Sequence, residues 1–471
     1  MTKRSAPMLI ILAALGFGAC ESQPIEAGND GGAMHDGATP ASDAPSAPAT
    51  DAPPAQTYPT REAYCEGEGP PIVLTPQGGT ACTGLIAQVA FRYAICSCEA
   101  FDGVGDISTD GFDHTQSGYD PTNPGSGAAV GVNAELTSVG AVLVGGPLSI
   151  GGALGLDLVA QASVRGTLGC GGPVTHQDDL TIAKDAFVAG DFRGAGTLTI
   201  DGTLTQPAGN DVYSLDSDIH AREEAPVNIP APCDCSEEKI YDIAGLVHAQ
   251  RAQNDNAAIA LDPSSLVGMV TGEKRVKLPC GRFYLHGIQG VASLVLEIEG
   301  RVALFVAGTL EITGGLRVEL APGAELDLFI EEGLKITGDL NLGDKQAPAR
   351  TRVYVGGAER IQLIGGSALN GNLYAPRAEL ASTGELEVFG ALFARRLSVV
   401  GDLSVHYDRA ILDVGAKCTT ETAGSPPPEC NDCRDCGNQA CVDGHCGACS
   451  VDADCCAPLL CREGRCVAPI L

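Results

Sequence analysis

The stretches Leu310-Glu-Ile312-Thr-Gly314 and Leu334-Lys-Ile336-Thr-Gly338 share one pattern: apolar, any, apolar, any, glycine. The pattern returns at residues 198–202, 296–300, 361–365 and 386–390. Alternation with a period of two predicts a strand with one buried face, and the glycine predicts a turn directly after it. From Gly314 the closing glycines fall at 338, 365 and 390, at intervals of 24, 27 and 25 residues. An interval near 25 predicts one coil of a solenoid.

Two all-β architectures are compatible with this pattern, a parallel β-helix and an antiparallel sandwich. Further short strands, at 326–328 and 397–401, suit three strands per coil but do not exclude the sandwich. We favour a mainly β, parallel β-helix over residues 126–412, because an internal period is the stronger cue to architecture. This fold predicts one buried ladder of four residues: Leu310, Leu334, Ile361 and Leu386.

One segment of the body has the spacing of a helix. Residues 236–254 place Ile240, Ile243 and Val247 on one face, and Ser236 is a candidate N-cap. We expect this helix to cap or plug the solenoid, which would otherwise expose apolar surface and strand edges.

The N-terminus reads as an export signal. Lys3 and Arg4 precede an apolar run from Met8 to Leu15 that is too short to span a bilayer. Residues 17–20, Phe-Gly-Ala-Cys, resemble a bacterial lipobox, although Phe17 replaces the usual Leu. The resemblance implies removal of a signal peptide at 1–19 and lipid attachment, as palmitate or a related acyl chain, to Cys20. The alternative is a plain secretory signal with Cys20 in a disulfide.

Composition divides the rest of the chain. Residues 20–58 are rich in Pro, Ala, Ser and Asp and predict a disordered tether. Residues 59–125 are predicted to form an N-terminal cap region with cysteines, and 413–429 a linker that ends in three prolines. Residues 430–471 form a separate cysteine-rich module.

Export makes disulfides the first expectation for the 20 cysteines. Without Cys20 the number is odd, so at least one thiol must stay free, pair between molecules or be modified. Eight precede the module: Cys65, Cys82, Cys96, Cys98, Cys170, Cys233, Cys235 and Cys280.

The module contains an internal duplication, because Cys436-x4-Cys441-x4-Cys446 recurs 20 residues later. Ten cysteines within 37 residues predict a core cross-linked by five disulfides. They are Cys430, Cys433, Cys436, Cys441, Cys446, Cys449, Cys455, Cys456, Cys461 and Cys466. Zinc is the competing interpretation, since Cys430, Cys433 and Cys436 have ligand-like spacing. We favour disulfides and expect no metal and no cofactor.

The charge excludes one class of partner. With 59 acidic and 29 basic residues the formal net charge is −30, which repels nucleic acid. The chain has no Trp and few aromatic residues, so stacking platforms for sugars or bases are scarce.

Several polar groups are candidates for chemistry. His406, Tyr407 and Asp408 could form a catalytic cluster faced by Arg395 and Arg396, but a structural pair that closes the last coil is sufficient. We favour the structural reading.

Two acidic groups have similar alternatives. An aspartate-rich loop at 102–120 could bind calcium or be merely solvated, and the solvated reading is favoured. Its members are Asp102, Asp106, Asp110, Asp113 and Asp120. Asp178 and Asp179 could be paired carboxylates, but strand alternation would point them apart.

The outward positions of the best-defined strands form a ladder of side chains with mixed charge. The two acidic side chains of this ladder are expected to lie about 14 Å apart, which is too far for the acid and base of glycan hydrolysis. These positions are Glu311, Lys335, Gln362 and Glu387.

The body and the module also resemble known families. Residues 372–378, 388–394 and 406–408 look like an uncharacterised domain of exported and pilus-associated bacterial proteins, similar to bactofilin-type β-helices and to choice-of-anchor surface proteins. Residues 109–113 and 131–133 are similar to landmarks of myxobacterial relatives. The Asp454-Cys-Cys456 run resembles Dickkopf-type cysteine-rich modules, a family that binds protein partners.

These features predict a non-enzymatic lipoprotein of the cell envelope, held at the outer membrane on its periplasmic or surface face. Its role would be structural, adhesive or the display of a partner site, toward a protein or a surface polymer. The alternative is a carbohydrate-active β-helix enzyme, either a polysaccharide lyase or a hydrolase. A carboxylate or basic cluster converging on one solenoid face would favour the enzyme.

Overall fold

The fold was analysed in a computed structural model of the chain. It describes residues 60–66, 72–73, 80–81, 83–364, 367–417, 440–442, 445–447, 449–455, 459–462 and 465–467. The predicted signal peptide, Cys20 and the tether lie outside these residues, as does most of the predicted linker.

The chain forms a parallel β-solenoid of about 14 turns, and 49% of it is strand. Each coil contributes in turn to three parallel sheets, here called sheets I, II and III; β3, β4 and β5 are the first strands of the three. In the register of each sheet, a strand pairs with the corresponding strand of the next coil. The predicted mainly β, parallel fold is confirmed, with three strands per coil.

The strands fall into two halves, separated by residues 225–266. The first half contains β3 (Ile95–Ser97), β4 (Phe101–Gly103), β5 (Ile107–Phe112), β6 (Val130–Val132), β7 (Glu135–Ser138), β8 (Val142–Val144), β9 (Leu148–Ile150), β10 (Gly155–Leu158), β11 (Ala162–Val164), β12 (Leu168–Cys170), β13 (Val174–His176), β14 (Leu180–Ile182), β15 (Ala186–Val188), β16 (Phe192–Gly194), β17 (Thr197–Gln206), β18 (Val212–Tyr213) and β19 (Asp216–Glu224). Its first coil therefore lies inside the segment 59–125 that was expected to be a cap.

The second half completes the solenoid. It contains β20 (Val267–Leu278), β21 (Gly281–Leu285), β22 (Ile288–Ile298), β23 (Arg301–Val306), β24 (Leu310–Ile312), β25 (Leu316–Leu320), β26 (Glu325–Ile330), β27 (Leu334–Ile336), β28 (Leu340–Leu342), β29 (Thr351–Val355), β30 (Ile361–Ile364), β31 (Ser367–Asn370), β32 (Asn372–Thr383), β33 (Leu386–Phe389), β34 (Leu392–Val400) and β35 (Leu403–Asp408). The longest strands bend at a corner and serve two sheets.

The predicted buried ladder of Leu310, Leu334, Ile361 and Leu386 is correct in part. Leu310 pairs with Leu334 in sheet II, and β30, which carries Ile361, packs beside β27. Ile361 is then followed by Leu380, whereas Leu386 belongs to sheet III and pairs with Leu403. The assignment of Leu386 was wrong because coil length varies: the next residue in the ladder comes 19 residues after Ile361, not 25.

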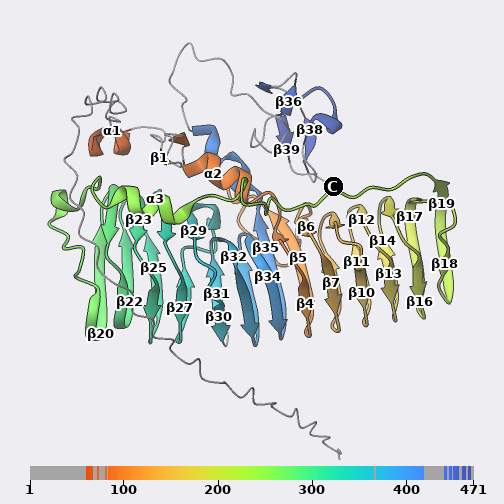
Figure 1. Cartoon of the computed structure of the whole chain (residues 1–471), viewed down its shortest axis with the longest axis horizontal. Helices are drawn as coiled ribbons and strands as arrows, with labels where there is room; N and C mark the ends of the chain where they lie inside the picture. Colours follow the sequence, from red (N-terminus) through yellow and green to blue (C-terminus); the bar gives the residue numbers. More distant parts are fainter. Residues whose placement is uncertain are drawn as a thin grey trace, which may run out of the picture. The chain divides into compact units, whose positions relative to one another are not determined.

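The two halves stack in an order that differs from the order of the sequence. In sheets I and II, β34 pairs in parallel with β3 and β4, and in sheet III β35 pairs with β5. The last coil of the chain therefore lies on its first coil, in the middle of the row (Figure 1). We call this junction the seam.

Residues 225–266, here called the strap, run back along the outer face of sheet I. Pro232 lies against Gly131 of β6, and Ile229 lies over Gly169 of β12; a Cβ at these glycines would lie 3.1 and 3.3 Å from the two strap side chains. At the seam the strap is fixed by the disulfides Cys96–Cys233 and Cys98–Cys235. Figure 1 shows the strap as the green segment that passes along one edge of the coils from β19 to α3.

Beyond the seam the strap contains the predicted helix, in a shorter form. Helix α3 spans Ile243–Gln250 and its N-cap is Asp242, not Ser236, because the Asp242 carboxylate accepts a hydrogen bond from Gly245 N. Ile243, Leu246 and Val247 are buried, and α3 contacts β23 and β26. After the helix, the Asn256 side chain exchanges two hydrogen bonds with the Tyr284 backbone, which covers the free edge of β21.

Sheet I of the second half is buried on both faces, which the alternating pattern did not predict. All five residues of β21 and of β29 are buried. Their outward side chains form an aromatic ladder under the strap: Tyr284, Phe305, Phe329, Tyr354, Tyr374 and Phe393. The rings of Phe305, Phe329 and Tyr354 are stacked, with centroids 5.0 and 4.8 Å apart.

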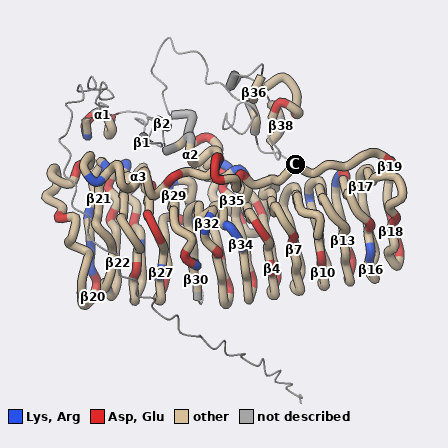
Figure 2. The backbone as a smooth tube through the Cα atoms, in the orientation of Figure 1, with Lys and Arg blue, Asp and Glu red and all other residues tan. Residues whose placement is uncertain are grey.

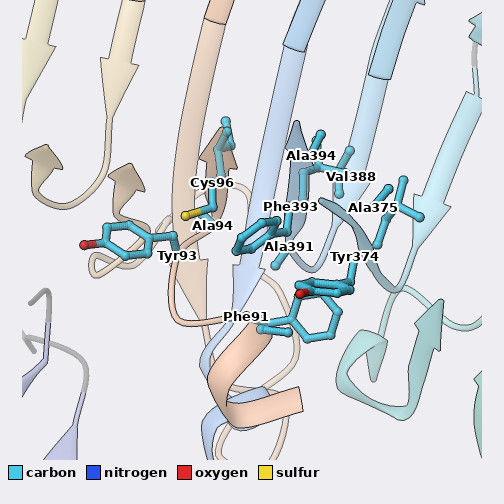
Figure 3. Close-up of a cluster of buried hydrophobic side chains, with 14 of the residues drawn as sticks. Phe91, Tyr93, Ala94, Cys96, Tyr374, Ala375, Val388, Ala391, Phe393 and Ala394 are labelled. Atoms are coloured by element: carbon cyan, nitrogen blue, oxygen red, sulfur yellow. The ribbon is translucent and has the colours of Figure 1, made fainter. Parts of the chain in front are cut away.

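The ladder reaches the seam, where α2 (Thr83–Ala90) and η3 (Arg409–Lys417) pack against each other. Figure 3 shows Phe91, which follows α2, beside Tyr374 and Phe393, with Cys96 on the neighbouring strand. The Tyr407 hydroxyl donates a 2.7 Å hydrogen bond to Phe91 O. The seam thus has an apolar core of its own, like any other part of the row.

The remaining described elements are short. Helix α1 (Arg61–Glu66) is joined to the start of β21 by the disulfide Cys65–Cys280, and β1 (Ile72–Val73) pairs with β2 (Thr80–Ala81). Cys170 is the free thiol among the described cysteines. Its burial raises its pKa to about 11, so the thiol stays protonated at neutral pH. In the described part of the chain, no helix is long and apolar enough to cross a membrane.

Candidate functional site

Most of the polar residues singled out in the sequence meet at the seam. Strand β35 lies on β5 with a constant offset of 296 residues, so that Ser404 pairs with Ser108 and His406 with Asp110. The two serine hydroxyls are 3.0 Å apart, and the Asp402 carboxylate accepts a 3.0 Å hydrogen bond from Asp106 N. These polar side chains of the last coil therefore face partners on the first coil.

Arg395 and Arg396 serve this junction and do not face the His406 cluster. Arg395 Nη1 lies 3.0 Å from both carboxylate oxygens of Glu99, and Arg396 Nη2 lies 2.6 Å from Asp102 Oδ2. Arg395 Nε also donates to Arg377 O. Both guanidinium groups are partly exposed, so each pair contributes modestly to stability while it fixes the register of the halves.

His406 is held between two carboxylates. Its Nδ1 lies 3.0 Å from Asp110, and its Nε2 lies 3.6 Å from Glu387. The imidazole packs on Phe389 and on Tyr119, with ring centroids 4.6 and 4.3 Å away. The Tyr119 hydroxyl donates to Asp110 Oδ2 at 3.1 Å. Desolvation and the Asp110 charge raise the pKa of Tyr119, so it remains a proton donor in this contact.

Asp408 makes a second contact across the seam and does not bind His406. Its side chain is fully buried, and one carboxylate oxygen lies 2.7 Å from His114 Nδ1. The same carboxylate accepts hydrogen bonds from the backbone N–H groups of His114, Ala349 and Ala410. The expected hydrogen-bonded pair of His406 and Asp408 is therefore not formed; the partners of Asp408 lie in the loop after β5, in the turn before β29 and in η3.

A pocket lies next to this cluster. It has a volume of about 200 Å³, and its wall is formed by β5, β8 and β11 together with Pro124 from the loop after β5. Asp110 lines one side of the pocket and Arg165 the other. The loop is held against β5 by a bridge between Gly111 and Gly125.

The five aspartates of the 102–120 segment are dispersed over one coil and its loop. Asp102 binds Arg396, Asp110 binds His406, and Asp106 accepts a 2.8 Å hydrogen bond from Ala141 N of the next coil. Asp113 and Asp120 bind residues of their own turns. Each carboxylate has a protein donor, so the geometry does not gather them around a common point.

Other aspartates explain part of the acidic composition. Asp179, Asp185 and Asp191 sit at coil corners and accept hydrogen bonds from the backbone N–H groups of Thr197, Thr203 and Asp211 on the following coil. Asp178 accepts from Asp179 N, so this adjacent pair takes part in a turn. A carboxylate at a corner satisfies backbone groups that the strands leave unpaired.

The expected ladder of outward charges is not a single ladder. Glu311 pairs with Lys335 in sheet II, but Glu387 lies in sheet III beside Ala368. The predicted separation of about 14 Å between Glu311 and Glu387 assumed that both residues lie in one sheet. This assumption was wrong, because the two residues belong to different sheets. Glu387 instead borders the His406 cluster.

The cysteine-rich module contains two equivalent hairpins. The first hairpin consists of the antiparallel strands β36 (Ala440–Val442) and β37 (His445–Gly447), in which Cys441 lies opposite Cys446. The second consists of β38 (Leu460–Arg462) and β39 (Arg465–Val467), in which Cys461 lies opposite Cys466. The predicted duplication therefore has a structural counterpart.

The structure defines two complete disulfides within the module. They are Cys449–Cys461 and Cys455–Cys466, and Cys441 is also disulfide-bonded. Cys449, Cys455 and Cys461 have sulfur atoms within 4.8 Å of one another, and all three are in these bonds. The bonding of the other five lies outside what the structure describes.

Fold and cross-links define a disulfide-bonded parallel β-solenoid protein with a disulfide-rich C-terminal region. Residues 236–414 match the model of a family described as a domain of unknown function (DUF7305). The match begins in the strap, contains the whole second half and ends in η3, so it stops at the seam. No curated protein and no solved structure matches the chain.

Sequence reasoning missed Glu99, Glu387 and Tyr119 as partners in the seam. Residues 99–110 lie beside residues 395–406, which come 296 positions later in the chain. No local pattern in either segment indicates that the two strands are neighbours. A regular signal was present in the first half. Its inward residues recur every six positions from Leu156 through Ala162, Leu168, Val174, Leu180, Ala186, Phe192, Leu198 and Leu204. Three such steps make an 18-residue coil.

Proposed function

We propose that this protein is a lipid-anchored, non-catalytic protein of the bacterial cell envelope that presents its solenoid and its cysteine-rich module to a partner. The anchor would be the acylated Cys20 after removal of residues 1–19, with 20–58 as the tether. The expected location is the outer membrane. The partner would be a protein or a surface polymer, not a nucleic acid, because of the net charge of −30.

The disulfides support the extracytoplasmic part of this proposal. Among the residues that the structure describes, disulfides join α1 to the solenoid, the strap to the first coil, and cysteines within the module, and such bonds persist in oxidising compartments. Figure 2 shows acidic residues spread over the coils of both halves, as expected for a surface that stays soluble and repels polyanions.

One observation carries the non-catalytic part: the charged groups that could act on a substrate are used to join the two halves. Arg395, Arg396, His406 and Asp408 each bind a residue of the first coil or the loop after it. The resemblances to bactofilin-type and choice-of-anchor proteins, and of the module to Dickkopf-type modules, favour a scaffold that binds partners.

Replacement of Cys20 by Ala is expected to move the protein from the membrane fraction to the soluble fraction. The acyl chains would be the only stable hold on the membrane, and the variant cannot carry them. Fractionation of cells after a high-salt wash measures the change, with Cys170→Ala as the control that keeps the anchor. A Cys20 variant that still sediments with membranes contradicts the proposed anchor.

The purified protein is expected to release neither reducing ends nor unsaturated products from acidic and neutral polysaccharides. Glycan cleavage requires an acid and a base placed around one glycosidic bond, and the seam groups are already bound to each other. Turnover that disappears in the His406→Ala or Asp110→Asn variant, while the protein remains folded, would establish the carbohydrate-active alternative.

A further inference from the structure

We infer that the pocket beside the seam is a binding site for a small zwitterion, an ammonium and a carboxylate on one short carbon chain. The inference goes beyond the proposed function and does not depend on the anchor or on the partner. It rests on an acid and a base that face each other across a slot one coil wide without forming an ion pair.

The slot results from a glycine in an otherwise filled corner. The register of β5, β8 and β11 places Asp110, Gly145 and Arg165 at the same corner of three successive coils. At the usual strand spacing, the outer two backbones are about 10 Å apart. Position 145 accepts only glycine, because the Cβ of any other residue would lie 2.4 Å from Thr109 O. The middle coil therefore forms the floor of the pocket and places no side chain at this corner.

The acid wall is rigid. The Asp110 carboxylate is held by His406 on one side and by the Tyr119 hydroxyl on the other, at 3.0 and 3.1 Å. Tyr119 lies between Phe112 and Phe389, with ring centroids 5.5 and 5.2 Å away. A carboxylate oxygen can accept more than one hydrogen bond, so Asp110 retains acceptor capacity toward the pocket that it lines.

The base wall is available. Arg165 lines the pocket and is exposed, and the structure gives its guanidinium no ion pair and no hydrogen bond within the described part of the chain. Arg395 and Arg396 of the seam, by contrast, both have carboxylate partners. A free guanidinium in a pocket binds a carboxylate best, through two parallel N–H groups.

The remaining lining sets the size and chemistry of the ligand. A volume of about 200 Å³ suits an amino-acid-sized molecule, and Leu143 and Pro124 offer apolar contact to a short side chain. The hydroxyls of Ser108 and Ser163 add two further polar contacts. A zwitterion has no net charge, so the acidic protein does not repel it, whereas an acidic sugar would bring an uncompensated negative charge beside Asp110.

The test uses the full chain and four probes that separate these contributions: alanine, propionate, ethylamine and glucuronate. Propionate lacks the ammonium group of alanine and ethylamine lacks its carboxylate. Isothermal titration at low salt is expected to show saturable binding of alanine. Propionate and ethylamine are expected to bind about tenfold more weakly or worse, the effect of losing one charge-assisted hydrogen bond.

Arg165→Gln is expected to weaken alanine binding by about tenfold or more and to leave the thermal unfolding midpoint unchanged, because Arg165 is an exposed corner residue that forms no ion pair with any residue the structure describes. Arg165→Lys, which keeps the charge, should retain more affinity than Arg165→Gln. The matched control is Arg222→Gln, an exposed arginine of β19 outside the pocket, which should not change binding.

Three outcomes overturn the inference. The first is no saturable binding of alanine up to about 20 mM, a concentration that detects even a millimolar site. The second is equal affinity for alanine in the Arg165→Gln variant. The third is tighter binding of glucuronate or propionate than of alanine, which would assign the pocket to a simple carboxylate or an acidic sugar.

Discussion

Asp327→Ala is expected to lower the free energy of unfolding by about 3 kcal/mol, because it removes the buried carboxylate that binds Arg352 and leaves the guanidinium with Glu325 alone as its counter-ion. Arg352 on β29 and Asp327 on β26 are both fully buried and form two hydrogen bonds, of 2.6 and 2.9 Å. Burial opposes the charge of Arg352, but Asp327 outweighs this cost and keeps the pKa of Arg352 well above its ordinary value. The variant cannot discharge the arginine, and Glu325, the carboxylate that remains beside it, is partly exposed and compensates the buried charge only in part. Chemical denaturation followed by circular dichroism measures the loss.

The control for this prediction is an ion pair on the surface. Lys335 and Glu359 lie 3.0 Å apart and both are about half exposed, so Glu359→Ala should change stability by no more than about 1 kcal/mol. The double variant Asp327→Leu, Arg352→Met removes both charges and should recover most of the lost stability. A loss for Asp327→Ala as small as that for Glu359→Ala would mean that water reaches Arg352.

Removal of both seam disulfides is expected to cost about 5 kcal/mol of stability, whereas removal of either one should cost far less. Cys96–Cys233 and Cys98–Cys235 each close a loop of 137 residues, and the two loops differ only by a shift of two residues. Loop closure restricts the unfolded chain once, so the second bond adds little entropy while the first remains. The prediction is therefore a strong departure from additivity.

The comparison requires three variants: Cys96→Ala with Cys233→Ala, Cys98→Ala with Cys235→Ala, and all four substitutions together. Denaturant midpoints under oxidising conditions provide the measurement, and reduction of the unmodified protein provides a control that also opens Cys65–Cys280. If each pair alone costs as much as all four, the bonds act through local packing at the seam and not through the unfolded chain.

The strand type and the solenoid could be predicted from the sequence because they depend on residues two to five positions apart. Leu310-x-Ile312 and Leu334-x-Ile336 alternate as strands in the structure, and they stack as predicted. Leu386 was misplaced because its local pattern is identical while its sheet is set by the lengths of the corners before it. A pattern of five residues specifies a strand but not the sheet to which the strand belongs.

The order of the coils could not be predicted, for a related physical reason. Any exposed solenoid edge can accept any coil of matching width, and β5 and β35 carry no local sign that they are partners. The burial of the outer face of sheet I was also not predicted, because Tyr374 is covered by Tyr241 of the strap, which lies more than 100 residues earlier in the chain. His406 and Asp408 were identified from their types, but their partners Asp110 and His114 follow only from the fold.

The position of the seam also determines how the protein would carry mechanical load. The described chain starts at Thr60, beside the Cys65–Cys280 bond at one end of the row, and leaves the solenoid through η3 in the middle. Tension applied between Thr60 and Lys417 passes through that bond into the second half alone. The first half, enclosed by Cys96–Cys233, stays outside the force path as a side arm. Stretching would therefore strip the coils between Cys280 and the seam while the arm and its pocket wall at Arg165 keep their shape.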